Sequence, residues 1–512
     1  MNILSRKSGD YMRDLWLLVA IQATVAAASL VVEIVAGRML APYVGMSLYT
    51  WTSVIAVVLA GFSAGHWVGG RLAEWTPDRA LRANGWAMLA ASASTAGAVF
   101  ILRNLSGPVI TSVPNPVASI VILTALVFFL PSFFAGIPAP ILSMIAVTYH
   151  PERRGRALGA MFAAGAWGAI LGTLAAGFVF ISWLGSTGTL AVVAAIYALL
   201  GLQSLVAARG LPGAAMGGAA LLLPLGLTVG ALNLPDPCTV ESNYFCIRVI
   251  ETSDGPSELS RLLVLDHLVH GAADRDDPRA MLTPHAMMLD GLARLRMEDR
   301  AAWAAYFIGG GSYSVPRAWR ALGTPAQVTV AEVDPAVTEV AISSFWYEPG
   351  DDRIVHADAR QTLLRESTMY DVIIGDAFSD IAVPQHLITR EFFELVRARL
   401  NTDGVYLMNI IDHNDRLEVL ASMIATARAV WPTVEIWANP GHDPAENRRV
   451  FVMVAGEGPS SRSQIHHDGP MPLSAIRVAA SSVDAIVEAR EPVVFTDDFA
   501  PIDRLLGDQG EG

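Results

Sequence analysis

Short apolar runs between residues 303 and 380 each end in glycines or in a carboxylate. The residues at these ends are Gly309, Gly310 and Gly311, then Glu332, Asp358 and Asp376. A buried parallel strand has this pattern when its carboxyl end lines a ligand crevice. The spacing therefore predicts four neighbouring strand ends that together form a nucleoside-binding edge.

Each of these residue types suits one part of such a ligand. The glycines allow a tight turn and a close approach of the backbone to the ligand, which a side chain would hinder. Glu332 lies about twenty residues further on, where an acidic residue of a doubly wound fold accepts hydrogen bonds from ribose hydroxyls. Asp358 could reach an adenine amino group, and Asp376 would point to the place where chemistry occurs.

The elements that must position these residues follow from the apolar pattern. It predicts strands at 303–308, 327–333, 353–356, 370–375, 403–410 and 449–455, with helices between them at, for example, 314–322 and 390–400. Before them, alternating residues at 244–250 and the run at 261–265 predict a small antiparallel sheet. A helical segment from His285 would then cover the large sheet.

At these positions the sequence resembles a known family. FIGGGSY, AEVD, ADA and DVIIGDAFSD are similar to motifs of the polyamine aminopropyltransferases, the spermidine synthases, and specifically of their membrane-fused branch. ESNYFCIRV and LVLDHLVHG resemble the small β-domain of the same family, so that the likeness covers residues 240–455. The tail VVFTDDFAPIDRL resembles a C-terminal signature of this branch, and its acids Asp497 and Asp498 would either contribute to the site or cap a helix.

The resemblance implies a role for each candidate residue. Asp376 would be the base that receives a proton from an attacking amine. The co-substrate would be decarboxylated S-adenosylmethionine or S-adenosylmethionine, with no metal. The residues expected to bind it are Gly309, Gly310, Gly311, Ser312, Glu332, Asp358 and Ala359. Those expected on the acceptor side are Tyr244, His270, His285, Asp380 and His386.

The chain departs from the family pattern on the amine-binding side. Ser312 stands where the family has an aspartate, His270 where it has a glutamine, and Ala286 where it has a glutamate. The expected reaction moves an aminopropyl group to an amine such as putrescine, giving spermidine and methylthioadenosine. Two alternatives stay open. One is a S-adenosylmethionine-dependent enzyme acting on another or membrane-delivered substrate, and the other is a polyamine or nucleoside transporter or sensor whose domain only binds.

Composition separates two halves of the 512-residue chain. Residues 1–235 carry a net charge of +6 and the remainder a net charge of −19. The acidic half suits a cationic substrate and argues against nucleic acid, although acids that only keep a surface soluble would give the same balance. Lys7 is the single lysine, which excludes lysine Schiff-base chemistry and a Walker-type loop from the catalytic half.

Seven apolar runs in the first half are long enough to cross a bilayer. They lie at about 15–40, 48–70, 84–102, 117–148, 157–181, 187–206 and 214–234. The fourth contains three prolines and is expected to be a kinked helix, or one helix with a re-entrant piece. The chain is therefore expected to be a multi-pass protein of the cell (inner) membrane.

Loop charges predict an orientation but leave the catalytic half unplaced. Most arginines, and Lys7, fall on one side if the runs alternate, which puts the N-terminus in the cytoplasm. Seven crossings would then place the catalytic half outside, whereas eight would return it to the cytoplasm. Cys238 and Cys246 could form a disulfide, which would favour an oxidising compartment, or remain two thiols.

The expected architecture has three parts. A multi-pass α-helical membrane domain of about seven helices occupies 1–235, and a small β-domain with a linking helix occupies 236–300. An α/β doubly wound, Rossmann-type domain of the class I S-adenosylmethionine-methyltransferase kind occupies 301–512. Soluble relatives commonly pair, which leaves a homodimer open.

Overall fold

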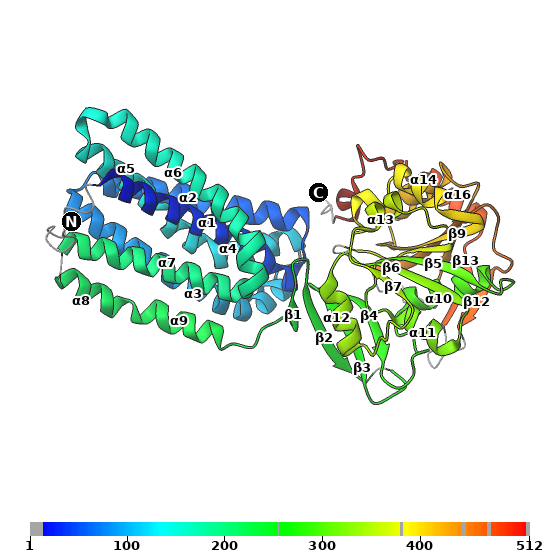
Figure 1. Cartoon of the computed structure of the whole chain (residues 1–512). Coiled ribbons are helices and arrows are strands. Elements are labelled where there is room, and N and C mark those ends of the chain that lie inside the picture. Colours follow the sequence, from blue (N-terminus) through cyan, green and yellow to red (C-terminus); the bar gives the residue numbers. More distant parts are fainter. Residues whose placement is uncertain are drawn as a thin grey trace. The chain divides into compact units, whose positions relative to one another are not determined.

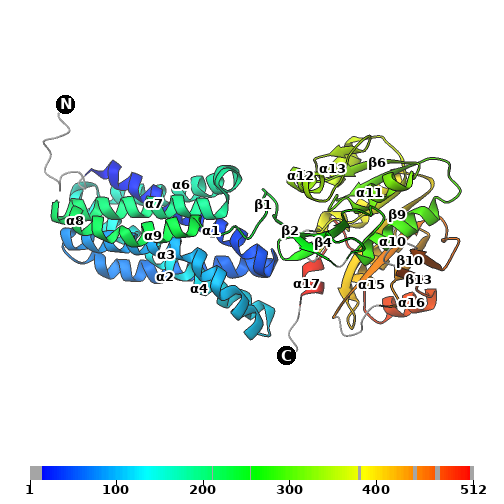
Figure 2. The same cartoon turned by 90° about the horizontal axis from the view of Figure 1, so that it is seen from below.

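The computed structural model describes residues 14–209, 211–253, 255–378, 382–441, 447–467 and 473–507. Its contacts divide the chain into two compact units, Met1–Pro237 and Cys238–Gly512. The first unit is helical and the second contains the sheets, as Figure 1 shows and the turned view of Figure 2 repeats. The long apolar runs of the sequence thus belong to the helical unit, and the short alternating runs belong to the unit that contains the sheets.

The first unit consists of helices joined by short connections. Polar caps begin several of them: the side chains of Asp14, Ser47 and Asn115 accept hydrogen bonds from first-turn amides of the helices that follow. The helices are α1 (Leu15–Val44), α2 (Leu48–Ala73), α3 (Pro77–Ser112), α4 (Pro116–Gly136), α5 (Pro138–Tyr149), η3 (Pro151–Arg153), α6 (Arg154–Ala175), η4 (Ala176–Phe180), α7 (Ile181–Arg209), α8 (Leu211–Ala220) and α9 (Leu222–Leu232).

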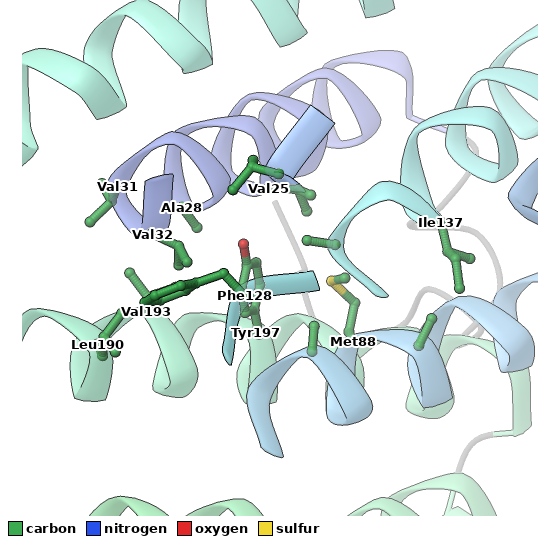
Figure 3. Packing of buried hydrophobic residues seen from close by; sticks show 14 of the residues in the cluster. Val25, Ala28, Val31, Val32, Met88, Phe128, Ile137, Leu190, Val193 and Tyr197 are labelled. Carbon is green, nitrogen blue, oxygen red and sulfur yellow. The ribbon is translucent and has the colours of Figure 1, made fainter. Parts of the chain in front are cut away.

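Small residues let these helices pack closely. A Cβ atom on Gly65 of α2 would lie 2.2 Å from a backbone oxygen of α4, and one on Gly168 of α6 would lie 2.2 Å from a backbone oxygen of α1. Only hydrogen fits at such contacts. Figure 3 shows apolar side chains from α1, α3, α4 and α7 that gather in the core between the helices. Among them the hydroxyl of Tyr197 lies 3.1 Å from that of Ser29.

Six helical stretches of the described residues are long and apolar enough to cross a membrane, whereas seven were expected. The difference lies in Pro151–Ala208, a 58-residue stretch that contains both α6 and α7. Gly185 interrupts it with a φ of 65° and a ψ of 178°. Pro116–Tyr149 is one stretch in which α5 continues α4 through a helical Ile137, so the proline-rich run is a kinked helix.

The second unit begins with a four-stranded antiparallel sheet in chain order. Its strands are β1 (Val240–Glu241), β2 (Cys246–Thr252), β3 (Ser260–Leu265) and β4 (Leu268–Asp274). Asp266 and His267 form the turn between β3 and β4, and Asp266 takes a positive φ of 54°. Cys238 and Cys246 are joined by a disulfide, which is one of the two states that their spacing left open.

A nine-stranded sheet forms the rest of this unit, in the order β12-β13-β10-β11-β9-β8-β5-β6-β7. The strands are β5 (Trp303–Ile308), β6 (Ala326–Ala331), β7 (Arg353–Val355), β8 (Tyr370–Gly375), β9 (Leu400–His413), β10 (Thr433–Ala438), β11 (Arg448–Gly456), β12 (Gln464–His467) and β13 (Leu473–Arg477). The helices are α10 (Pro284–Arg296), α11 (Ser314–Leu322), α12 (Pro335–Ser344), α13 (Ala359–Arg365), η5 (Gln385–Leu387), α14 (Arg390–Ala398), α15 (Glu418–Arg428), α16 (Ala480–Glu488) and α17 (Ile502–Leu506).

The order and direction of the strands decide which residues meet at one edge of the sheet. Strands β7, β6, β5, β8 and β9 pair in parallel, so their carboxyl ends meet along one edge. The strand expected at 449–455 is β11, which runs antiparallel to β9. Two apolar clusters, one with Tyr306 and Phe393 and one with Phe307 and Trp319, take alternate residues of β5, so both faces of the sheet are buried.

Candidate functional site

The glycine turn after β5 brings two strand ends into contact. Gly309 and Gly311 have φ values of 92° and 52°, which side chains larger than hydrogen rarely tolerate. A Cβ atom on Gly309 would lie 2.6 Å from the backbone oxygen of Asp376. The backbone amide of Asp376 in turn donates a hydrogen bond of 3.0 Å to the carbonyl of Ile308. The turn and the carboxylate that follows β8 therefore have a fixed separation.

Glu332, directly after β6, is hydrogen-bonded to the same turn. It is only 6% exposed, and its carboxylate accepts hydrogen bonds from the amides of Gly310 at 2.8 Å and Asp334 at 2.9 Å. Burial raises the pKa of this carboxyl, while the amide donors act against that rise. The side chain still reaches the cavity described below, where a carboxylate oxygen has lone pairs left for a ribose hydroxyl.

Asp358, three residues after β7 and at the start of α13, has a hydrogen-bond partner on each oxygen. One oxygen caps α13 by accepting from the amide of Gln361 at 2.9 Å. The other lies 2.7 Å from Nε2 of His386, in the segment that leads into α14. His386 was expected on the acceptor side, but the structure places it against the carboxylate expected to meet adenine.

Asp376 presents two oxygens in different surroundings. Asn409 of β9 donates its side-chain amide to Oδ1 at 2.8 Å. Nε2 of His285, in the first turn of α10, lies 3.8 Å from Oδ2. The side chain keeps 27% of its surface exposed and lines the cavity described below.

Histidine rings cover this carboxylate. His270 of β4 packs its ring against that of Phe378, with 6.4 Å between the ring centres. Burial is the main cause that lowers the pKa of His270 to about 4, and the neighbouring His285 and His267 lower it further. His270 is therefore neutral at pH 7. Tyr244, just before β2, also borders the cavity and is 47% exposed.

These residues enclose a cavity of about 480 Å³ at the carboxyl edge of the sheet. A smaller hollow beside it, of about 30 Å³, contains Gly310 and Ser312. Asp380 lies outside the described residues. The predicted site residues that line the larger cavity are Tyr244, His270, His285, Gly309, Gly311, Glu332, Asp358, Ala359, Asp376 and His386. Residues as far apart in the sequence as Tyr244 and His386, 142 positions, thus line the same cavity.

Other residues of the site are less visible in the sequence. Asn409, Asp412 and His413 lie near the carboxyl end of β9, and of these three Asn409 lines the cavity. Asp412 points away, because its oxygens accept from the amides of His413 at 2.7 Å and Leu420 at 2.8 Å. Side chains alternate along a strand, so residues 409 and 411 of β9 share one face and residue 412 lies on the other. This alternation is the sequence feature that could have distinguished Asn409 from Asp412.

The C-terminal segment also reaches the site. Asp497 pairs with both terminal nitrogens of Arg360, at 2.7 and 2.6 Å, and accepts from the hydroxyl of Thr389 at 2.7 Å. Arg360 lies in α13, two residues after Asp358, and also donates to the carbonyl of His386 at 3.0 Å. The acids that were expected either to contribute to the site or to cap a helix thus include one that holds the segment carrying His386.

Comparison with known proteins identifies this region. Residues 297–440 match the Spermine/spermidine synthase domain. A polyamine aminopropyltransferase of Vibrio vulnificus is 36% identical over 106 residues, which is 20% of this chain and 36% of that protein. A probable polyamine aminopropyl transferase of Bifidobacterium longum is 32% identical over 119 residues, 23% of this chain and 26% of that protein.

The alignments therefore span about a third and about a quarter of these two relatives. Among solved structures, a probable spermidine synthase from Corynebacterium glutamicum is similar with 21% identity and a TM-score of 0.45, covering 52% of this chain and 99% of that one. The residues that match the spermine/spermidine synthase domain, 297–440, lie within the second unit.

Proposed function

We propose that the second unit transfers an aminopropyl group from decarboxylated S-adenosylmethionine to a primary amine and releases methylthioadenosine. The observation that carries this proposal is Asp376. Asn409 donates a hydrogen bond to one of its oxygens, and the side chain lines the cavity beside the glycine turn. It lies within the region that matches the spermine/spermidine synthase domain.

The cavity is large enough to hold a nucleoside. Its volume of about 480 Å³ falls within the range of about 300–1,000 Å³ that small-molecule sites occupy. Glu332 would hold the ribose, and Asp358 with Ala359 would face the adenine. The glycine turn would border the sulfonium end, because Gly309 touches the backbone of Asp376 and any side chain there would fill the space.

The reaction needs a proton acceptor beside the amine. An alkylammonium has a pKa near 10.4, so at neutral pH the nitrogen has no free lone pair for attack. Asp376 would orient the amine and accept its proton while the C–N bond forms. The carbon–sulfur bond breaks at the same time, and its electron pair stays on the sulfur of methylthioadenosine. Holding the two reactants in line supplies much of the remaining rate.

The test is replacement of Asp376 by Asn in the full chain. We expect methylthioadenosine release to fall by about 10²–10⁴-fold, the usual contribution of a general base. Binding of methylthioadenosine, measured by calorimetry, should be retained because Glu332 and Asp358 are unchanged. The exposed Asp299, replaced by Asn, is the matched control. Undiminished turnover in the Asp376→Asn variant would refute the role of this carboxylate.

The first unit, in the same proposal, lies in a bilayer. A stretch of 58 residues is about 87 Å long as a helix, far more than the hydrocarbon thickness of about 30 Å, so Pro151–Ala208 would cross twice. The 12-residue α5 is too short to cross alone, so Pro116–Tyr149 would cross once. The six stretches then make seven crossings.

A further inference from the structure

The disulfide between Cys238 and Cys246 closes a short loop that forms part of the cavity wall. We refer to residues 238–246 as the disulfide loop. It contains β1 and the turn into β2, and its residues Tyr244 and Phe245 line the cavity. Because β1 is two residues long, few ladder hydrogen bonds hold this wall. The disulfide adds a covalent restraint where the backbone pairing is weak.

Ser242 is the residue through which the disulfide loop contacts the large-sheet part of the unit. Its Oγ accepts hydrogen bonds from the amides of Tyr244 at 3.0 Å and Phe245 at 2.9 Å, which fixes the turn. The same hydroxyl donates to Oδ2 of Asp334, the residue that caps α12. Ser242 is 8% exposed and Asp334 is 2% exposed, so this contact is shielded from water.

Asp334 connects Ser242 to Glu332. Its other oxygen, Oδ1, accepts from the amide of Ala336 at 3.0 Å, so the side chain is held on both oxygens. Its backbone amide donates to Oε1 of Glu332 at 2.9 Å, while the amide of Gly310 donates to Oε2 at 2.8 Å. A continuous series of hydrogen bonds therefore runs from the disulfide loop to the carboxylate proposed to hold the ribose.

Apolar packing makes the same connection. Phe245 packs against a cluster that includes Ile247 of β2 and Val337 and Val340 of α12. The first turn of α12, which follows its cap Asp334, is thus held against the disulfide loop by apolar contacts as well as by the hydrogen bond from the loop. Loosening the loop would disturb both.

We propose that Ser242 is a positioning residue for Glu332 and that the disulfide holds it in place, so that nucleoside binding depends on the oxidation state of this disulfide. The proposal rests on the nucleoside site of the proposed function and adds what keeps that site in shape. In the oxidised protein the loop is ordered before the ligand arrives. In the reduced protein its two aromatic side chains must be ordered on binding, which costs affinity.

Reversible reduction of the full-length protein in detergent tests the proposal. An added dithiol gives the S–S bond two electrons and two protons, leaving two thiols, and is itself oxidised to a disulfide. The chain has two cysteines, and both belong to this bond. We expect the Kd for methylthioadenosine, measured by calorimetry, to rise at least about fivefold on reduction and to return on reoxidation. An unchanged Kd would overturn the proposal.

A variant with serine at both cysteine positions, Cys238→Ser with Cys246→Ser, controls for effects of the reagent. Its loop is never closed, so its Kd should equal that of the reduced protein and should not respond to the dithiol. A Kd equal to that of the oxidised protein would contradict the role of the disulfide.

Substitutions of Ser242 test the positioning role itself. Ser242→Ala should raise KM for the nucleoside about fivefold, the equivalent of one hydrogen bond, with kcat within about twofold because Asp376 is unchanged. Ser242→Thr keeps the hydroxyl and should restore most of the loss. Ser257→Ala is the matched control, since it removes a hydrogen bond of 2.8 Å to Asp274 away from the cavity lining. A lower kcat at unchanged KM in Ser242→Ala would refute the assignment.

Hydrogen exchange separates this proposal from the proposed reaction, because it needs neither ligand nor turnover. In the ligand-free protein, reduction should speed exchange in the peptides that contain Tyr244 and Asp334, measured by mass spectrometry. If methylthioadenosine binds but no amine is modified, aminopropyl transfer fails, and the ratio of the two Kd values still decides the proposal. Exchange at Asp334 that does not change on reduction would show that the loop does not hold Glu332 and would overturn it.

Discussion

At the scale of single residues, the two oxygens of Asp376 differ in a way that suits a base. Oδ1 is fixed by the side-chain amide of Asn409, whereas Oδ2 lies near His285 and the cavity. A carboxylate held at one oxygen keeps the other in a constant direction, which matters when the acceptor nitrogen must lie in line with a breaking bond. The neighbouring amide thus acts on geometry rather than on the reacting atoms.

Replacing Asn409 by Ala tests this positioning role. The variant removes the donor to Oδ1, and we expect kcat to fall about tenfold, the equivalent of one lost hydrogen bond to a charged group of about 1.5 kcal/mol. KM for the nucleoside should stay within about twofold, because Glu332 and Asp358 are unchanged. A change in KM alone, measured in the same steady-state assay, would contradict the assignment. Asn401→Ala, at the start of β9 and away from the cavity lining, is the control.

At the scale of elements, the C-terminal segment and α13 fix the segment that carries His386. Asp497 binds Arg360 through two hydrogen bonds and also accepts from Thr389, the residue that caps α14. The hydrogen bonds from Arg360 are the main cause that lowers the pKa of Asp497 to about 2. Nothing in the sequence distinguished Asp497 from Asp498, whereas the structure shows that Asp497 forms these contacts.

We predict that Asp497→Asn weakens nucleoside binding while Asp498→Asn does not. Without the charged pair, Arg360 holds the carbonyl of His386 less firmly, and the contact between His386 and Asp358 loosens. We expect the Kd for methylthioadenosine to rise about fivefold, equivalent to about 1 kcal/mol for a partly exposed pair. Calorimetry measures this directly, and similar Kd values in both variants would contradict the prediction.

At the scale of the whole molecule, the loop charges, the proposed number of crossings and the disulfide all favour the same side of the membrane for the second unit. If the first unit makes the seven proposed crossings, three of them separate the basic segment at 153–156 from Pro235, and these two would lie on opposite faces of the membrane. The guanidinium of Arg103, near the end of α3, donates to the carbonyl of Pro235, which places these two on one face. We therefore propose that, with the basic segment in the cytoplasm, the second unit lies outside, where a disulfide would persist.

Thiol labelling of intact cells tests this topology. We expect no labelling of Cys238 or Cys246 by a membrane-impermeant maleimide until a membrane-impermeant phosphine reduces the disulfide. Serine at both positions gives the background. Labelling that requires permeabilised cells would instead place the second unit in the cytoplasm. The result also decides on which side of the membrane the nucleoside must be supplied.

Much of the fold was accessible from the sequence because its signals are local. Apolar runs of about twenty residues predicted the helices of the first unit, and the runs at 303–308 and 370–375 coincide with β5 and β8. Strands β10, β12 and β13 were missed; each is only four to six residues long, and β12 lies at the edge of the sheet. The gap between the runs expected at 157–181 and 187–206 contains Gly185, the residue at which the structure breaks the helical stretch.

By itself, the sequence determined which residues end the parallel strands, because a glycine turn or a terminal carboxylate is a property of neighbours along the chain. The tertiary structure decided the partners: Asn409 with Asp376, His386 with Asp358, and Asp497 with Arg360, the last pair 137 positions apart. Such pairings depend on strand order and on which face each side chain takes. No local pattern encodes either, so the surroundings of Asp376, Asp358 and Asp497 became visible only when the strands were in place.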